Sequence, residues 1–332
     1  MPHEQHRTSI SSAPGHRWAL ILAGGEGSRL QSLTTTASGV AIPKQFCSFG
    51  GEASLLHDAL RRAQTVTTPA QTCAVVSDHH RLWWQAMDLR IPAANVIRQP
   101  GNRGTALGIL LPLLQILHRD PEARLLVLPS DHFVCDETVL AESLRAAMRQ
   151  IRRQPDRIVM LGISPDEADP ELGYIVSDSD VTLDLRAVSE FVEKPSSAVA
   201  RALIARGGVW NSFIFAAKGK TLLRAFEQRC RELALELWEI VSAPGRATQA
   251  DDLADFYRRA PSLDFSRDIL QRSPELLRVL TVPPCGWSDL GTPRRVSEAL
   301  TRFPPRQART RNAGHVAFLD LTQHRPVTYA SG

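Results

Sequence analysis

Short apolar runs alternate with amphipathic stretches through the first half of the chain. A continuous or alternating apolar run predicts a strand, whereas apolar residues at every third or fourth position predict a helix. Strands that alternate with helices are typical of βα units, which build a mostly parallel sheet. By these rules we expect strands at residues 18–22, 72–77, 95–98, 124–129 and 157–163, and helices at 55–64, 104–118 and 137–153.

The pattern changes in the second half of the chain. Strands are expected at residues 173–177, 187–193, 214–217 and 277–282, and helices at 197–206 and over 221–243. We therefore predict an α/β fold, with a doubly wound, mostly parallel Rossmann-like sheet over residues 17–163 and a smaller mixed lobe over 164–300. Residues 1–16 are polar and predict a flexible tail. Residues 301–332 form a short C-terminal extension with one strand-like run at 315–321.

Composition places the chain among ordinary globular proteins. It has 332 residues, of which 43% are hydrophobic and 22% charged, which excludes disordered, collagen-like and coiled-coil proteins. The longest apolar run, residues 107–117, is well short of the ~20 residues that a membrane span needs. The net charge of +4 is spread without a basic tract, which argues against a nucleic-acid partner and fits an anionic small molecule.

The cysteines indicate a reducing compartment. There are five, widely spaced and without a C-x-x-C pair, so neither a disulfide framework nor a zinc site is expected. The first 16 residues carry no apolar stretch after their charges, unlike a secretory signal peptide. We therefore expect a cytoplasmic protein.

A glycine-rich segment, LAGGEGSRL, follows the first predicted strand. Without Cβ atoms, its glycines let backbone N–H groups approach phosphate oxygens. Leu30 stands where a dinucleotide fingerprint requires glycine, and no Gly-Lys-Ser/Thr follows, so neither that motif nor a Walker A loop fits. Arg29 and Lys44 add a guanidinium fork and a compact ammonium, which suit a triphosphate whose diphosphate leaves. The alternative is a turn with two solvated cations.

Lysine is rare in this chain, with four lysines among 39 basic residues. Positions that keep lysine are candidates for sites that need a compact ammonium, and two of them, Lys44 and Lys194, lie in such segments. Lys194 follows Glu193 at the end of a predicted strand, before Pro195. Alternation would send the two side chains to opposite faces, so both can serve a ligand only at the edge of the sheet. A surface ion pair is the alternative.

Two aspartates are candidate magnesium ligands. Asp131 follows the predicted strand 124–129, where ligands of open α/β sheets bind, and Asp289 lies in the glycine-bounded segment GWSDLG after strand 277–282. Magnesium normally takes one or two carboxylates together with phosphate oxygens. A helix N-cap or loop role is the alternative for Asp131.

Together these segments resemble the sugar-1-phosphate nucleotidylyltransferases, and most closely the mannose-1-phosphate guanylyltransferase branch. LAGGEGSRL followed by PKQF, LPSDH, FVEKP, WNS and GWSDLG carry the resemblance. It implies Mg²⁺ on Asp131 and Asp289, and catalytic roles for Arg29, Lys44 and Lys194. It further implies sugar-phosphate contacts from Gly173, Glu193, Lys194 and Asn211, and nucleotide contacts from Leu22, Ala23, Gly24, Gly25, Gly27, Ser28, Gln99, Arg103 and Thr105. For Thr105, helix capping is an equal alternative, and for Asn211, turning a loop.

The resemblance implies that a hexose 1-phosphate attacks a nucleoside triphosphate and releases pyrophosphate, with GTP and mannose 1-phosphate as the leading pair. Another base or sugar, or a non-catalytic regulatory homologue that binds nucleotide sugars, stays open, as does assembly into a homo-oligomer. The chain departs from the family at Gly104, where Asn is usual, and at Phe213, where Gly is usual. The segment 262–270 lacks a Glu-Lys, and the loop 30–44 is longer. These departures lie on the base and sugar sides of the site, so the reaction type is better supported than either substrate.

Overall fold

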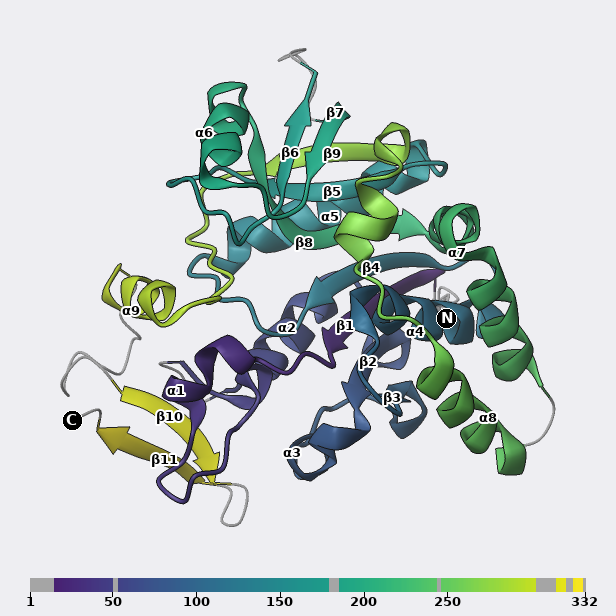
Figure 1. The fold of residues 1–332 in the computed structure, drawn as a ribbon, viewed down its shortest axis with the longest axis horizontal. Helices are drawn as coiled ribbons and strands as arrows, with labels where there is room; N and C mark the ends of the chain where they lie inside the picture. Colours follow the sequence, from purple (N-terminus) through teal and green to yellow (C-terminus); the bar gives the residue numbers. More distant parts are fainter. Residues whose placement is uncertain are drawn as a thin grey trace, which may run out of the picture.

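The structure, a computed structural model, describes residues 15–49, 53–178, 185–243, 246–302, 315–320 and 325–330. Nine strands form one mixed sheet in the order β3-β2-β1-β4-β8-β5-β9-β7-β6 (Figure 1). Their bounds are β1 Arg17–Ala23, β2 Thr72–Ser77, β3 Val96–Gln99, β4 Arg124–Pro129, β5 Ile158–Ile163, β6 Tyr174–Ser177, β7 Leu185–Val192, β8 Val209–Lys218 and β9 Leu277–Val282.

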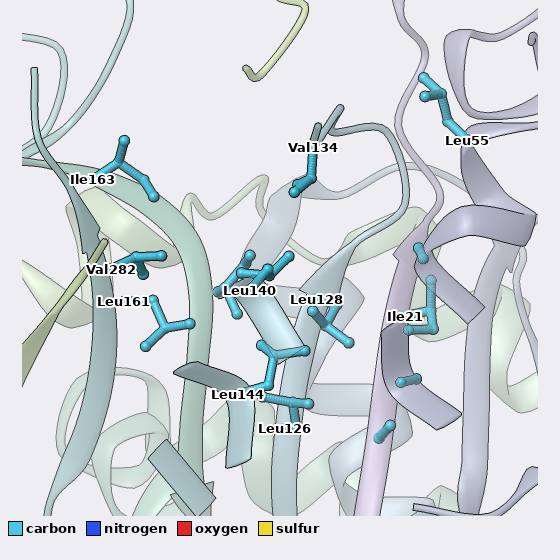
Figure 2. Close-up of a cluster of buried hydrophobic side chains, with 14 of the residues drawn as sticks. Ile21, Leu55, Leu126, Leu128, Val134, Leu140, Leu144, Leu161, Ile163 and Val282 are labelled. Carbon is cyan, nitrogen blue, oxygen red and sulfur yellow. The ribbon is translucent and has the colours of Figure 1, made fainter. Parts of the chain in front are cut away.

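The first four strands of this order are parallel and carry helices on both faces, which confirms the predicted doubly wound arrangement. Alternate residues of β1 enter opposite layers: Ile21 packs in one apolar cluster and Leu20 in the other. The first cluster includes residues of α5, and the second is filled by α4. Figure 2 shows part of the first cluster, where Leu126 of β4 and Leu144 of α5 meet.

The sheet continues past residue 163, where the doubly wound core was expected to end. β8 lies antiparallel between β4 and β5, and β5 pairs in parallel with β9. A strand from the second half of the chain is therefore inserted beside the parallel half. The pattern of apolar residues could not predict this insertion, because every one of these strands is largely buried and would suit several neighbours.

The helices begin where polar side chains cap them. Ser54 accepts from His57 N–H at the start of α2, and Asp136 accepts from the first turn of α5. The helices are α1 Gln31–Thr34, α2 Leu55–Gln64, α3 Arg81–Gln85, α4 Gly104–Arg119, α5 Glu137–Arg153, α6 Ser197–Ala205, α7 Gly219–Ser242, α8 Arg246–Arg259, α9 Pro293–Arg302 and the π-helix Phe265–Leu270. Single 3₁₀ turns lie at Ser28–Leu30, Lys44–Phe46, Pro69–Gln71, Asp78–His80, Ala93–Asn95 and Pro274–Leu276.

Two strands form a separate antiparallel pair near the C-terminus, β10 His315–Asp320 and β11 Arg325–Ala330. Only the first was expected from the sequence. Residues 1–14 of the expected tail and residues 303–314, 321–324 and 331–332 of the expected extension lie outside the described residues. Within the described part of the chain, no helix combines the length and the apolar character that crossing a bilayer requires.

Candidate active site

The glycine-rich loop leaves the carboxyl end of β1 and folds onto the turn that contains Lys44. The buried amide of Gln45 donates from Nε2 to the carbonyls of Ala23, at 3.1 Å, and Gly25, at 2.9 Å. Gly27 has φ of +62°, and a Cβ atom there would lie 2.9 Å from the backbone nitrogen of Lys44. Glycine is therefore required at 27 both by its conformation and by this contact.

The Lys44 ammonium joins three segments that are far apart in the sequence. Its Nζ lies 3.0 Å from Asp131 Oδ2 and donates to the backbone carbonyls of Asp289, at 2.5 Å, and Leu290, at 3.3 Å. The residue is only 5% exposed. Because an ammonium has three donors, all three are used within the protein. Lys44 was predicted to stabilise leaving pyrophosphate, but these contacts instead make it the group that positions both aspartate segments.

Short backbone pairing brings the two predicted metal ligands to the same place. After β4, Phe133 exchanges two hydrogen bonds with Ser288, at 2.9 and 3.0 Å. Asp131 and Asp289 flank this bridge, on segments about 160 residues apart. The Asp131 side chain is 35% exposed and the Asp289 side chain 12%. The structure therefore brings together the two segments that carry the predicted metal ligands.

The surroundings of Asp131 favour its ionised form. Partial burial alone would raise the pKa of its carboxyl, but the charges of Lys44 and His132 and a hydrogen bond from Lys44 outweigh it, so the pKa is lowered. Burial lowers the pKa of His132 to about 4. His132 is therefore neutral at pH 7, and its Nδ1 accepts from Trp287 Nε1 at 3.3 Å.

The donor set fits a magnesium ion. Asp289 Oδ1 is buried and makes no hydrogen bond to any described residue, with Arg295 as its nearest cation at 3.5 Å. The Asp131 carboxylate, on the segment paired with that of Asp289, is partly exposed. Among the described residues no group of three or more His, Cys, Asp or Glu side chains could hold a metal. Two carboxylates with room for phosphate oxygens are the arrangement that Mg²⁺ prefers.

The predicted sugar-side residues Gly173, Glu193 and Asn211 also come together. Asn211 N donates to Gly173 O at 2.8 Å. A Cβ atom on Gly173 would lie 2.5 Å from Glu193 Oε2 and 3.3 Å from Asn211 Cβ. β7 ends at Val192, and Lys194 has φ of +48° and is exposed, so strand alternation no longer separates it from Glu193. Glu193 and Lys194 thus lie just past the end of β7, which is where the sequence allowed both side chains to serve one ligand.

Glu193 has an unusual environment for a carboxylate. Its Oε2 is buried and makes no hydrogen bond within the described part of the chain. Burial, and then the charge of Asp264, raise the pKa of Glu193 to about 7, although Lys194, Ser266 and Arg267 oppose this shift. Near neutral pH the side chain is therefore present both as the carboxylate, which only accepts hydrogen bonds, and as the carboxylic acid, which can donate one.

Three predicted contact residues are engaged within the protein. Arg103 donates from Nε to the carbonyl of Tyr257 and from a terminal nitrogen to that of Arg258, so it fastens the end of α8. Thr105 Oγ1 accepts from Phe265 N at 2.8 Å, which is neither a cap nor a free hydroxyl. The nucleotide contacts expected of Arg103 and Thr105 stay predictions. Arg29 lies 2.9 Å from Glu171, but both side chains are half exposed.

The remaining predicted nucleotide residues lie at the carboxyl ends of β1 and β3. Gln99 ends β3, and its Oε1 would be 3.0 Å from a Cβ atom on Gly24. Its Nε2 is buried without a hydrogen-bond partner among the described residues, so one donor stays unused beside the loop. The others are Leu22 and Ala23, which end β1, and the loop residues Gly25 and Ser28, of which Ser28 begins a 3₁₀ turn.

Two residues of the site were missed by sequence reasoning. Arg295 is 7% exposed, lies 2.7 Å from Asp169 and stacks over Trp210 at 4.8 Å. Ser266 contacts the sugar-side cluster. No motif marks Arg295, because an arginine in an amphipathic helix is ordinary. Ser266 lies in the segment 262–270, which was noted only as a departure.

Comparisons with known proteins show the family to which the chain belongs. A family profile described as nucleotidyl transferase matches residues 18–303. The xanthan biosynthesis protein XanB of Xanthomonas campestris pv. campestris is 30% identical over 280 residues, which are 82% of this chain and 57% of that protein. A mannose-1-phosphate guanylyltransferase of Escherichia coli K12 is 29% identical over 288 residues, 83% of this chain and 58% of that protein. The chain thus spans a little over half the length of these curated relatives.

A solved structure shows the same fold. It is described as a mannose-1-phosphate geranyltransferase from Thermus thermophilus and is 26% identical in sequence. The match covers 86% of this chain and 79% of that chain, with a TM-score of 0.73. This likeness supports the α/β fold class and places the described sheet among structures of similar architecture.

Proposed function

Because the chain belongs to the nucleotidyl transferase family, we propose that it joins GTP to mannose 1-phosphate and releases pyrophosphate, giving GDP-mannose. The observation that carries the proposal is the meeting of Asp131 and Asp289 at the Lys44 ammonium, beside the glycine-rich loop. The base and sugar are taken from the names of the relatives, two of which are described as acting on mannose 1-phosphate.

The proposed reaction needs positioning and charge neutralisation more than acid–base chemistry. A phosphate oxygen of the sugar 1-phosphate attacks the α-phosphorus of the triphosphate in line, and the bond to pyrophosphate breaks. The nucleophile is already an anion, so no general base is required. Lys194 holds the attacking phosphate, and the backbone N–H groups of the loop hold the triphosphate.

Arg29 is the cation that reaches the leaving pyrophosphate. In this structure it pairs with Glu171, and both side chains are half exposed. Exposed ion pairs contribute about 0–1 kcal/mol, so a triphosphate can displace Glu171. Lys44 acts differently, because its three donors keep the Asp131 and Asp289 segments in place.

We propose Mg²⁺ as the cofactor, held by Asp131 and Asp289. Bound there, it would neutralise negative charge on the phosphates. The buried Asp289 Oδ1, which makes no hydrogen bond to a described residue, and the lowered pKa of Asp131 support this assignment, because carboxylate oxygens are the ligands that a hard cation prefers. We also propose a cytoplasmic location, which the five unpaired cysteines support.

A substrate panel tests the proposal. Pyrophosphate release is measured for GTP, ATP, CTP and UTP, each with mannose, glucose or galactose 1-phosphate, with and without Mg²⁺. We expect the highest kcat/KM for GTP with mannose 1-phosphate, and no release without the metal. A different best pair would replace the base or sugar. Nucleotide binding without release for any pair would favour the non-catalytic regulatory alternative.

The raised pKa of Glu193 predicts a pH-dependent stability. Its pKa in the folded protein, about 7, exceeds the usual value of 4.5, so the stability it contributes is present at low pH and lost as pH rises through 7. Glu193→Gln removes this titration. We expect the melting temperature of the variant, relative to wild type, to increase between pH 5 and pH 8.5.

The matched control is Glu190→Gln, three residues earlier and within β7, where the carboxylate is 41% exposed and pairs with Arg206. It should show no such upward trend. A Glu193→Gln difference that stays constant across this pH range would contradict the raised pKa.

A further inference from the structure

The segment Ser262 to Gln271 packs against the predicted sugar-side residues Glu193 and Asn211. It belongs to the face that α4 and α7 cover, because Phe265 packs in their apolar cluster (Figure 1). Two of its side chains reach the predicted sugar residues. Gln271 Oε1 accepts from Glu193 N at 2.9 Å, and Ser266 Oγ accepts from Asn211 Nδ2 at 3.4 Å.

Close backbone contacts fix the start of this segment on α4. Leu263 O accepts from Ala106 N at 3.0 Å, and Leu263 N donates to Arg103 O at 3.1 Å. Gly104 has φ of +81°, and a Cβ atom there would lie 2.2 Å from Leu263 O. Any other residue at 104 would therefore displace the segment.

Aromatic packing holds the next residue. Phe265 stacks on Phe215 at 5.2 Å between ring centroids and meets Phe213 edge-on at 6.1 Å. Its N–H is held by Thr105. Phe213 thus packs against this segment. Gly104, Phe213 and the segment 262–270, at which the chain departs from the family, therefore pack against one another. Their packing fixes the position of Ser266.

Ser266 is 1% exposed and contacts Asn211, one of the two side chains expected to read the sugar, by accepting from its Nδ2. The other side chain, Glu193, is a neighbour of the same amide: a Cβ atom on Gly173 would lie 2.5 Å from Glu193 Oε2 and 3.5 Å from Asn211 Nδ2. Asn211 Oδ1 is itself taken by Phe213 N at 2.9 Å.

This chain of bonds leaves one donor and one acceptor for a ligand. The second N–H of the Asn211 amide carries no bond to a described residue, and neither does Glu193 Oε2. An adjacent donor and acceptor match two neighbouring hydroxyl groups of a sugar ring. The direction of the donor depends on the Ser266 hydroxyl, because that hydroxyl holds the other N–H of the same amide.

We propose that Ser266 is a positioning residue that orients the Asn211 amide beside Glu193 and thereby sets which hexose 1-phosphate the site accepts. The inference rests on the proposed function, because it assigns these side chains to the sugar. Ser266 touches neither the reacting phosphates nor the triphosphate loop in this arrangement. Its loss should therefore weaken sugar recognition and leave nucleotide recognition unchanged.

Steady-state kinetics of Ser266→Ala test this. With mannose 1-phosphate, we expect the KM for the sugar to increase about 5–10-fold, as for one lost hydrogen-bond link. The KM for GTP should stay within about twofold. The ratio of kcat/KM for mannose over glucose 1-phosphate should fall by a similar factor. Ser143→Ala is the matched control, because Ser143 is buried and bonds only Val139 O in α5.

The outcomes separate the inference from the proposed function. Wild-type protein that releases pyrophosphate from no pair overturns both. Active wild type with an unchanged sugar KM and unchanged sugar preference in Ser266→Ala overturns the inference alone. Equal increases of both KM values would also overturn it, because they indicate a general loss of structure. Melting curves of both variants, within a few degrees of wild type, confirm that each is folded.

Discussion

Replacing Asp131 or Asp289 by asparagine should lower kcat about 10²–10³-fold in the productive substrate pair. Each substitution removes one negative charge from the proposed Mg²⁺ site, and electrostatic groups of this kind each contribute about 2.7–4 kcal/mol to transition-state stabilisation. The fold should persist. An asparagine at 131 still offers Lys44 an oxygen, and Lys44 bonds the backbone of 289 and not its side chain. Pyrophosphate release as a function of Mg²⁺ concentration is the measurement.

The two variants should also show weaker Mn²⁺ binding in the presence of nucleotide, by electron paramagnetic resonance, which does not depend on turnover. Asp88→Asn is the matched control, because Asp88 is 81% exposed on the surface. It should keep wild-type rate and metal binding. If Asp289→Asn retained full activity, Asp289 would not be a metal ligand.

Lys44→Met should reduce both turnover and stability. The substitution removes the only group that bonds the Asp131 carboxylate and the Asp289 backbone at once, as far as the described residues show. Hydrogen bonds to charged groups contribute about 1.5–3 kcal/mol, so the free energy of unfolding should decrease by about that amount. We expect kcat to fall at least 10²-fold, because the two carboxylates lose their common anchor. Urea unfolding and pyrophosphate release measure the two effects.

Lys44→Arg should not rescue Lys44→Met, because a planar guanidinium does not fit a buried site shaped for a compact ammonium. Lys220→Met is the control. Lys220 also pairs with a carboxylate, Glu122 at 2.5 Å, but its side chain is 56% exposed. It should change stability by less than about 1 kcal/mol. A Lys44→Met enzyme with wild-type kcat would show that Lys44 does not position the aspartates.

Much of the fold was predictable because its elements carry strong local signals. The helices α2 and α5 begin and end where the sequence placed them, since Ser54 and Asp136 cap them and their apolar stripes are regular. The strand β4 is an unbroken apolar run. In contrast, α8 and α9 were not predicted, because both are rich in polar and charged residues and have few large apolar ones.

The order of strands was less predictable. β8 enters between β4 and β5 through pairings with residues about 90 and 55 positions away. Such non-local pairings depend on how the buried faces of the strands pack in the folded protein, which the pattern of residues along one sequence does not reveal. The sequence did predict that Asp131 and Glu193 follow the ends of strands, as they follow β4 and β7 in the structure, because motifs at strand ends carry a local signal.

The sequence was less informative where a residue's type suits two roles. Arg103 could bind a phosphate or a carbonyl, and only the structure shows that it bonds the end of α8. The same holds for Lys44, whose type predicted a phosphate contact and whose burial commits it to Asp131. Ser266 carries no motif, and its place beside Asn211 follows from tertiary packing around Phe265.

The fate of labelled phosphates in GTP tests the central claim most directly. Protein, Mg²⁺ and mannose 1-phosphate are incubated with GTP labelled at either the α- or the γ-phosphorus. Attack at the α-phosphorus predicts that the α-label appears in a nucleotide sugar and the γ-label in pyrophosphate, in equal amounts. Appearance of the γ-label in orthophosphate or on the sugar would contradict the account, because attack would then occur at a different phosphorus.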